Sequence, residues 1–149
     1  MKWDTSENVA GNARRVLPKL AQNYFQAGRK AHGKRSPKAL HRFRIATKRF
    51  RYALELFRPV YGPSLDRRLK AVRKLQDVLG KISDQQTILT LLADDTEMCD
   101  KIQRALRRKS RDFRKQWQIF DSDDELKKWK VYLARGPRSG PARRSKSRS

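Results

Sequence analysis

Cationic side chains recur at helical spacing in the segment 40–57. At steps of three or four residues, a helix would place four of them in a ladder along one face: His41, Arg44, Lys48 and Arg51. The segment contains no acid before Glu55. Like charges at this spacing destabilise a helix, and a solvated face usually alternates its charges. The ladder therefore favours an anionic ligand over the alternative of a merely solvated surface.

The composition of the whole chain supports an anionic partner. The 149 residues include 38 Lys and Arg against 15 Asp and Glu, which gives a formal net charge of +23 and a pI near 11.1. Proteins with this imbalance bind nucleic acid, phosphate polymers or acidic membranes. A surface that only provides solubility is the alternative, but so large a charge costs stability in the compact state.

The sequence shows no pattern typical of an enzyme. It has no glycine-rich phosphate loop, no Ser-His-Asp arrangement and no set of carboxylates for the metal ions of phosphoryl transfer. Cys99 is the single cysteine, which argues against an intrachain disulfide and a structural zinc site. We therefore expect no catalytic residue, no cofactor and no bound metal.

Hydropathy places no segment in a membrane. No apolar run approaches the roughly 20 residues of a membrane span, and the N-terminus lacks the apolar core of a signal peptide. We expect a cytoplasmic protein without membrane insertion.

Start and stop signals predict the helices that position the ladder. Ser36 followed by Pro37 is typical of a helix start, and Pro59 predicts an end near Arg58. An earlier apolar stripe predicts a helix to about residue 30, followed by a linker at 31–35.

Later signals predict further helices and a basic tail. One helix should begin after Ser64 and end or bend at Gly80, and a separate one should follow from Ser83 or Asp84. Two more are predicted at about 97–120, with Met98, Ile102, Leu106, Phe113 and Trp117 buried, and after a capping box of Ser122 and Glu125. The fold class is all-α, a bundle of about five to six long antiparallel helices. It forms one domain at 1–134, and the apolar-poor segment 135–149 is a disordered basic tail.

Two other predicted helices carry cations. Arg67, Lys70 and Lys74 share a polar stripe with Arg73 at its flank, which fits binding and a solvated surface equally well. The helix at about 97–120 is also rich in Lys and Arg, but these residues spread around its circumference. The tail fits a polyanion-binding arm and a solubilising end equally well.

The segment 40–57, together with Leu69-Lys70 and the run from Leu75 to Asp84, resembles the CHAD domain, the conserved histidine α-helical domain. The shared pattern is His-x-x-Arg-x-x-x-Lys-Arg-x-Arg-Tyr, followed by Gln-x-x-Leu-Gly-x-x-x-Asp. The resemblance covers about residues 5–120. It implies an all-helical protein that binds inorganic polyphosphate in a basic groove, often at polyphosphate granules.

The resemblance also implies which residues bind. Phosphate contacts are expected from two helices: His41, Arg44, Lys48, Arg49 and Arg51 on one, and Lys70, Arg73 and Lys74 facing them from the other. Tyr52 and Asp84 are expected to position these groups.

The chain departs from the family in carrying one helical repeat where typical members carry two. It is closest to the second repeat, and no other His-x-x-Arg ladder occurs in it. We therefore expect a homodimer that completes the two-repeat groove. Two other functions stay open: a nucleic-acid-binding protein, and an adaptor that docks an acidic partner protein. If polyphosphate is the ligand, nucleic acid would bind as a weaker polyanion.

Overall fold

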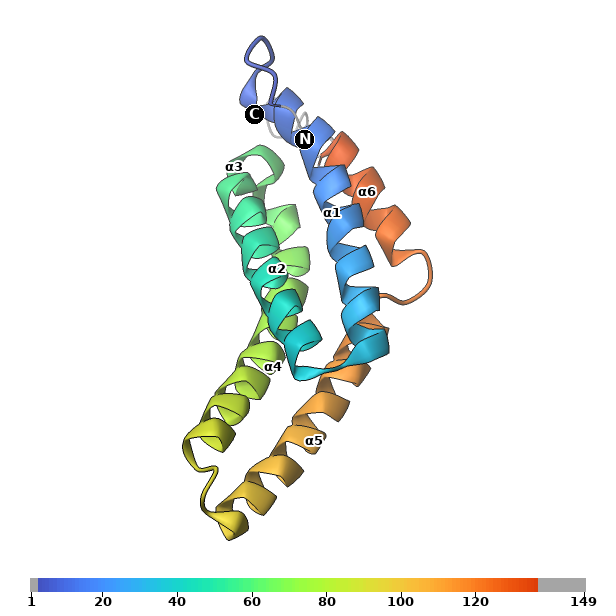
Figure 1. Ribbon diagram of the computed structural model, residues 1–149. Helices are drawn as coiled ribbons and strands as arrows, with labels where there is room; N and C mark the ends of the chain where they lie inside the picture. The colour runs from blue at the N-terminus through green and yellow to red at the C-terminus, as the bar shows by residue number, and fades with distance from the viewer. Residues whose placement is uncertain (1–2, 137–149) are drawn as a thin grey trace, which may run out of the picture.

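The computed structural model describes residues 3–136, which form helices joined by short turns, with no strand among them (Figure 1). The predicted all-α fold is confirmed. The predicted tail from residue 137 onward lies outside the described residues. The helices are α1 (Val9–Lys34), α2 (Pro37–Leu56), α3 (Arg58–Tyr61), α4 (Asp66–Leu91), α5 (Thr96–Phe120) and α6 (Glu125–Arg135), with a 3₁₀ turn at Gly62–Leu65 between α3 and α4.

The junction between α1 and α2 is shorter than predicted. The Oγ of Ser36 accepts a hydrogen bond from the backbone N–H of Ala39 at 3.2 Å, which confirms the predicted start of α2. The predicted linker at 31–35 is instead helical through Lys34, and Arg35 ends α1 with a φ of 49°. Burial of Ala31 in the core outweighs the helix-weakening effect of Gly33.

Helix α4 passes through Gly80 without ending, so the two helices predicted around this residue are one. A helical glycine costs about 1 kcal/mol relative to alanine. Leu75, Leu79 and Ile82 lie on both sides of Gly80 and are all buried in the core, which offsets that cost.

The predicted capping box at the start of α6 does not form. Asp124 occupies the N-cap position with a φ of 48° and makes no side-chain cap, while the Oγ of Ser122 donates to the carbonyl of Ile119 at 2.9 Å. Ser122 therefore contacts the last turn of α5, and it lies two residues before the N-cap of α6 instead of at it.

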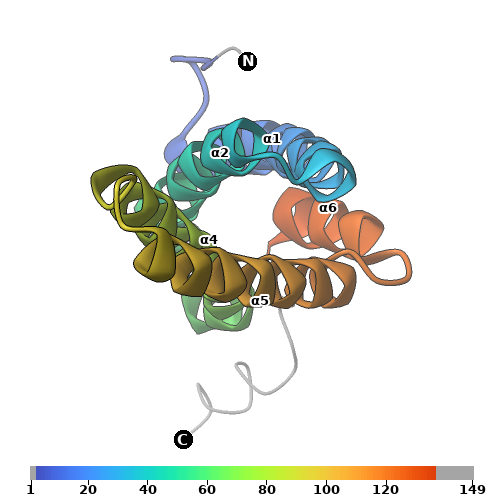
Figure 2. The same cartoon turned by 60° about the horizontal axis from the view of Figure 1, so that its bottom comes forward.

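The helices pack as two hairpins side by side. Helices α1 and α2 form one hairpin and α4 and α5 the other, with α2 packed against α4, and α6 returns along α1 (Figures 1 and 2). The hydroxyl of Tyr61 donates to the carbonyl of Leu133 at 2.7 Å, and the Nζ of Lys130 donates to Gln22 at 2.8 Å. These bonds fix α6 against the N-terminal half of the chain.

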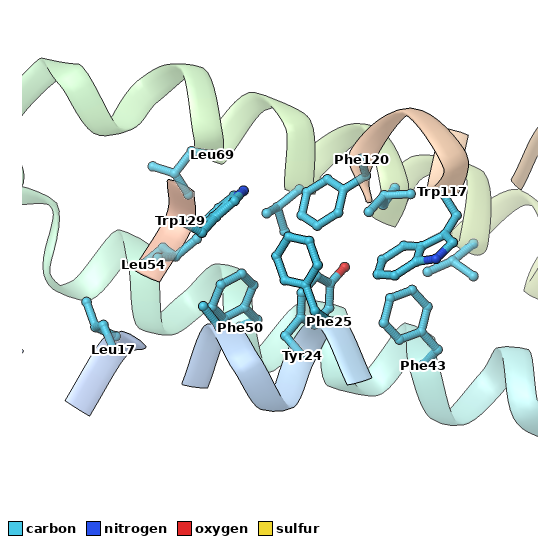
Figure 3. Packing of buried hydrophobic residues seen from close by; sticks show 14 of the residues in the cluster. Leu17, Tyr24, Phe25, Phe43, Phe50, Leu54, Leu69, Trp117, Phe120 and Trp129 are labelled. Carbon is cyan, nitrogen blue, oxygen red and sulfur yellow. The ribbon is translucent and has the colours of Figure 1, made fainter. Parts of the chain in front are cut away.

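Aromatic side chains fill the core between the hairpins (Figure 3). The ring of Tyr24 on α1 stacks on Phe50 and Phe43 of α2, with centroids 4.5 and 5.0 Å away. Trp117 of α5 packs where Gly28 of α1 leaves room, since a Cβ at Gly28 would collide with its ring. The buried faces of α1, α2 and α5 are thereby fixed, and the opposite faces are left for solvent or ligands.

The far half of the α4–α5 hairpin extends beyond the rest of the bundle (Figure 1). No residue from Ser83 to Asp112 is buried. The prediction that the whole apolar stripe of α5 is buried is therefore wrong in its first half: Met98 is exposed, and Ile102 and Leu106 are half-buried. Two helices alone cannot cover each other's apolar faces, and no third helix within residues 3–136 reaches this far.

Candidate functional site

An ion-pair network joins the two helices that were predicted to carry the site. Glu55 of α2 accepts from the Nη1 of Arg51 at 3.5 Å and from the Nη2 of Arg73, on α4, at 2.9 Å. Arg51 and Glu55 are one helical turn apart, whereas Arg73 reaches across from the neighbouring helix. We call the surface formed by Arg44, Lys48, Arg51, Glu55 and Arg73 the α2–α4 edge.

Arg51 is held on several sides but keeps one free donor. Its guanidinium lies over the ring of Tyr52, 4.7 Å from the centroid. Its side chain is only 21% exposed. The Nε of Arg51 is buried and has no hydrogen-bond acceptor among the described residues. Because this Nε is buried, an anion at the edge would meet the outer nitrogens of the guanidinium and not the Nε.

Arg44 and Lys48 continue the edge toward the N-terminus of α2. Both are half-buried, and within residues 3–136 neither takes part in an ion pair. His41 precedes them on α2 and is exposed. At 1.5 Å per residue, His41 to Arg51 spans about 15 Å of helix, so a ligand that contacts the whole ladder must be extended.

The structure does not place all of the predicted residues at this edge. Arg49 lies on the other side of α2, beside a hollow that Leu20 and Asn23 of α1 also line. Lys70 and Lys74 line a groove between α4 and α5, and of the three cations predicted on α4 only Arg73 contacts α2.

Asp84 lies farther along α4. Asp84 is exposed and lies 11 residues after Arg73 on α4, just as Arg44 lies 11 residues before Glu55 on α2. Because α2 and α4 run antiparallel, Asp84 and Arg44 lie at about the same level, roughly 16 Å from the Glu55–Arg73 contact. Tyr52 contacts Arg51 directly, whereas Asp84 makes no hydrogen bond or ion pair with another described residue.

Sequence reasoning missed the role of Glu55. The sequence could have indicated it, because Glu55 is the single acid of the segment 40–57. A carboxylate at this position is expected to pair with a cation one turn away on the same helix or with a cation on a neighbouring helix. Gln116 and Ile119, which line the α4–α5 groove with Lys70 and Lys74, carried no such signal, since the pairing of α4 with α5 is a tertiary contact.

The described residues contain no group of three or more His, Cys, Asp or Glu side chains placed to hold a metal ion. Across residues 3–136, each helix is too short or too polar to cross a bilayer. The charged groups of the α2–α4 edge are guanidinium and ammonium groups and one carboxylate, that of Glu55.

Comparison with known proteins identifies the family. The family model for the CHAD domain matches residues 3–93, which include all of α1, α2, α3 and α4. No curated protein and no solved structure matches the chain. Because the matched segment covers more than half of the 149 residues, the chain belongs to the CHAD domain family.

Proposed function

We propose that this chain binds inorganic polyphosphate along the α2–α4 edge and does so without catalysis. The CHAD domain is associated with polyphosphate binding, and the match covers the helices that build this edge. The observation that carries the proposal is the row formed by Arg44, Lys48 and Arg51, in which the first two have no described carboxylate partner and Arg51 is oriented by Glu55. A location at polyphosphate granules belongs to the same proposal.

The binding energy comes from several charge-assisted hydrogen bonds along an extended polymer. Arginine donates forked hydrogen bonds to phosphate, and lysine acts as a point charge. Glu55 holds Arg51 and Arg73 in place before the ligand arrives, so less side-chain entropy is lost on binding. Because bound cations release the polymer's counterions, affinity should fall steeply with salt.

Removing the row tests the proposal. The triple variant Arg44→Ala, Lys48→Ala, Arg51→Ala should weaken polyphosphate binding by at least about 30-fold at low salt, since each charge-assisted bond contributes about 1.5–3 kcal/mol before screening. Titration calorimetry measures the affinity, and circular dichroism checks the helicity.

A matched control removes the same charge elsewhere. Lys19, Lys127 and Lys128 are exposed on α1 and α6, and their triple alanine variant also loses three positive charges. It should bind nearly as tightly as the wild type. Equal affinity losses in the two triple variants would show that net charge, and not the α2–α4 edge, binds the polymer.

Nucleic acid is the alternative ligand, and the exposed aromatics argue against it. Single-stranded nucleic acid is usually bound with bases stacked on aromatic side chains. Among residues 3–136, the aromatic side chains that are exposed are Trp3 and Tyr52; Trp3 stacks on Phe57 and Tyr52 lies under Arg51. Long-chain polyphosphate should therefore displace RNA or DNA, and nucleic acid at equal phosphate concentration should not displace polyphosphate.

The homodimer is the second part of the proposal, and the projecting α4–α5 hairpin supports it. The hairpin carries Leu91, 77% exposed, together with Ile88 and Met98 at 36% and 37%. Apolar side chains gathered on a projecting element are typical of an interface. The occupant we propose is the same hairpin of a second copy.

Charge complementarity favours that occupant. The tip of the hairpin carries Asp94, Asp95, Glu97 and Asp100, whereas α5 behind it carries Lys101, Arg104, Arg107 and Arg108. In an antiparallel pair of hairpins related by a twofold axis, the acidic tip of each copy lies against the basic stem of the other. A parallel pair of hairpins would instead place the two acidic tips against each other and the two basic stems against each other.

Leu91→Lys should turn the dimer into a monomer, because it removes an apolar contact and places a cation against the basic stem of the other copy. Leu56 is the matched control: it is 72% exposed but lies at the end of α2, away from the hairpin, so Leu56→Lys should leave the mass unchanged. Light scattering measures the mass. A wild type that stays strictly monomeric while it binds polyphosphate tightly would refute the dimer.

A further inference from the structure

The groove between α4 and α5 adjoins the Glu55 network on α4, since Lys70 and Lys74 on its rim lie three residues before and one residue after Arg73. Its volume is about 350 Å³, and it is lined by three cations and one amide, Arg67, Lys70, Lys74 and Gln116, and by Ala71, Leu75, Ile119 and Phe120. No acid lines it. Among the described residues, none of the three cations takes part in an ion pair.

The groove has a cationic rim and an apolar part, which suit different chemical groups of a ligand. Arg67, Lys70 and Lys74 follow one another at steps of three and four, so their charges lie in a row along the rim. The floor is apolar, with Leu75 and Phe120 almost fully buried, and Ile119 is 69% exposed at the other wall. Inorganic polyphosphate has no apolar part and would leave the exposed side chain of Ile119 and the half-buried Ala71 in contact with water.

We propose that the α4–α5 groove binds anions that carry both phosphate groups and an aromatic ring, such as a nucleotide. The phosphates would lie along Lys70, Lys74 and Arg67, and the ring would cover Ala71 and the side chain of Ile119. A volume of about 350 Å³ is at the lower end of the range for ligand pockets and suits a single ring system. This site shares no residue with the α2–α4 edge, so it does not depend on the proposed polyphosphate function.

ATP and tripolyphosphate form a matched pair of probes, both used without divalent metal. Each contains a chain of three phosphates, but tripolyphosphate carries the higher charge and lacks the nucleoside. Charge alone would make tripolyphosphate the tighter ligand. Titration calorimetry on the Arg44, Lys48 and Arg51 triple-alanine variant, which lacks the proposed polyphosphate edge, should instead show ATP binding more tightly, because the base covers Ala71 and the exposed side chain of Ile119.

Three variants locate the ATP site. Ile119→Ser removes apolar wall without changing charge, so it should weaken ATP by about three- to tenfold and leave tripolyphosphate unchanged. Lys70→Ala with Lys74→Ala should weaken both probes. The Arg44, Lys48 and Arg51 triple variant should bind ATP as the wild type does, even where its polyphosphate affinity is lost.

Three results would overturn the proposal. These are tripolyphosphate binding as tightly as ATP to the Arg44, Lys48 and Arg51 triple variant, an ATP affinity that Ile119→Ser leaves unchanged, and loss of ATP binding in that triple variant. The last would mean that all anions share the α2–α4 edge. Failure of the polyphosphate proposal looks different, since it appears as unchanged polyphosphate affinity in that same variant.

Discussion

Glu55 bridges two arginine side chains from different helices. It accepts from Arg51 on its own helix and from Arg73 on α4. Ion pairs as exposed as these contribute about 0–1 kcal/mol to stability. Their main effect is therefore positional: two guanidinium groups from different helices are held at one carboxylate, with their remaining donors free for an anion.

Two glycines should respond in opposite ways to the same substitution. A Cβ at Gly80 meets no atom within 4 Å, so Gly80→Ala should stabilise the fold by about 0.5–1 kcal/mol through helix propensity. A Cβ at Gly28 meets the buried ring of Trp117, so Gly28→Ala should destabilise it by about 1–3 kcal/mol. Urea denaturation measures both; equal effects of the two substitutions would contradict the packing of α1 against α5.

His32 is the histidine that should make stability depend on pH. Its Nε2 is buried without a hydrogen-bond partner among the described residues. Burial lowers the pKa of His32 below its ordinary value of 6.5, and the nearby Arg35 and Arg114 lower it further, while Asp121 partly opposes them. The neutral form is therefore favoured in the folded state.

The sign of the pH effect follows from that direction. At a pH well above 6.5, His32 is neutral in both the folded and the unfolded chain and contributes no pH dependence. As the pH falls below 6.5, the unfolded chain takes up the proton more readily, so the free energy of unfolding should decrease. His32→Gln should remove this decrease between about pH 7.5 and 5.5, whereas His41→Gln at an exposed position should keep it. A His32→Gln variant with the wild-type pH response would contradict the assignment.

At the scale of elements, the α4–α5 hairpin divides into two parts. Near the bundle, α5 contributes Phe113, Trp117 and Phe120 to the core. In the tip, from Ser83 on α4 through Asp112 on α5, no residue is buried. Local unfolding costs least where few apolar contacts would be lost.

Hydrogen exchange should resolve this division. In dilute solution, amides at 84–108 should exchange faster than those of α1 and α2, because the hairpin tip has no third helix to protect it. At concentrations that favour the dimer, protection should rise at 84–108 and stay constant in α1. Uniform protection along the hairpin at all concentrations would show that the tip is stable without a partner copy.

The helices were largely predictable from local signals, and the exceptions have tertiary causes. Ser36 and Pro37 marked the start of α2 correctly because a cap is a local hydrogen bond. Gly80 was misread as a break because its cost is local, whereas the burial of Leu79 and Ile82 that offsets it is not. The stripe of α5 was predicted to be buried along its whole length, since periodicity reports an apolar face but not whether another element covers it.

The site was predictable only within single helices. The spacing of Arg44, Lys48 and Arg51 follows from the geometry of α2 alone. Which residues of α4 face α2 does not follow from α2 alone. The sequence predicted that Lys70, Arg73 and Lys74 face α2 together, whereas Arg73 pairs with Glu55 of α2 and the two lysines line the groove with α5. A helical wheel gives angles within a helix but not which neighbour occupies which angle.

For the whole molecule, the net charge of +23 sets opposite salt responses for folding and for binding. Self-repulsion destabilises the compact state, so added salt should raise the free energy of unfolding. The same salt should weaken polyphosphate binding, because it removes the advantage of counterion release. Thermal denaturation and calorimetry across 50 to about 500 mM NaCl test both; a binding constant that does not change with salt would contradict an electrostatic mechanism.

The central claim is that a phosphate polymer lies along the α2–α4 edge, and a crystal structure with a short polyphosphate tests it most directly. We expect consecutive phosphates beside α2, contacting Arg44, Lys48 and the guanidinium of Arg51. Phosphates bound elsewhere, for example along α5, with no density at Arg44, Lys48 and Arg51, would contradict it.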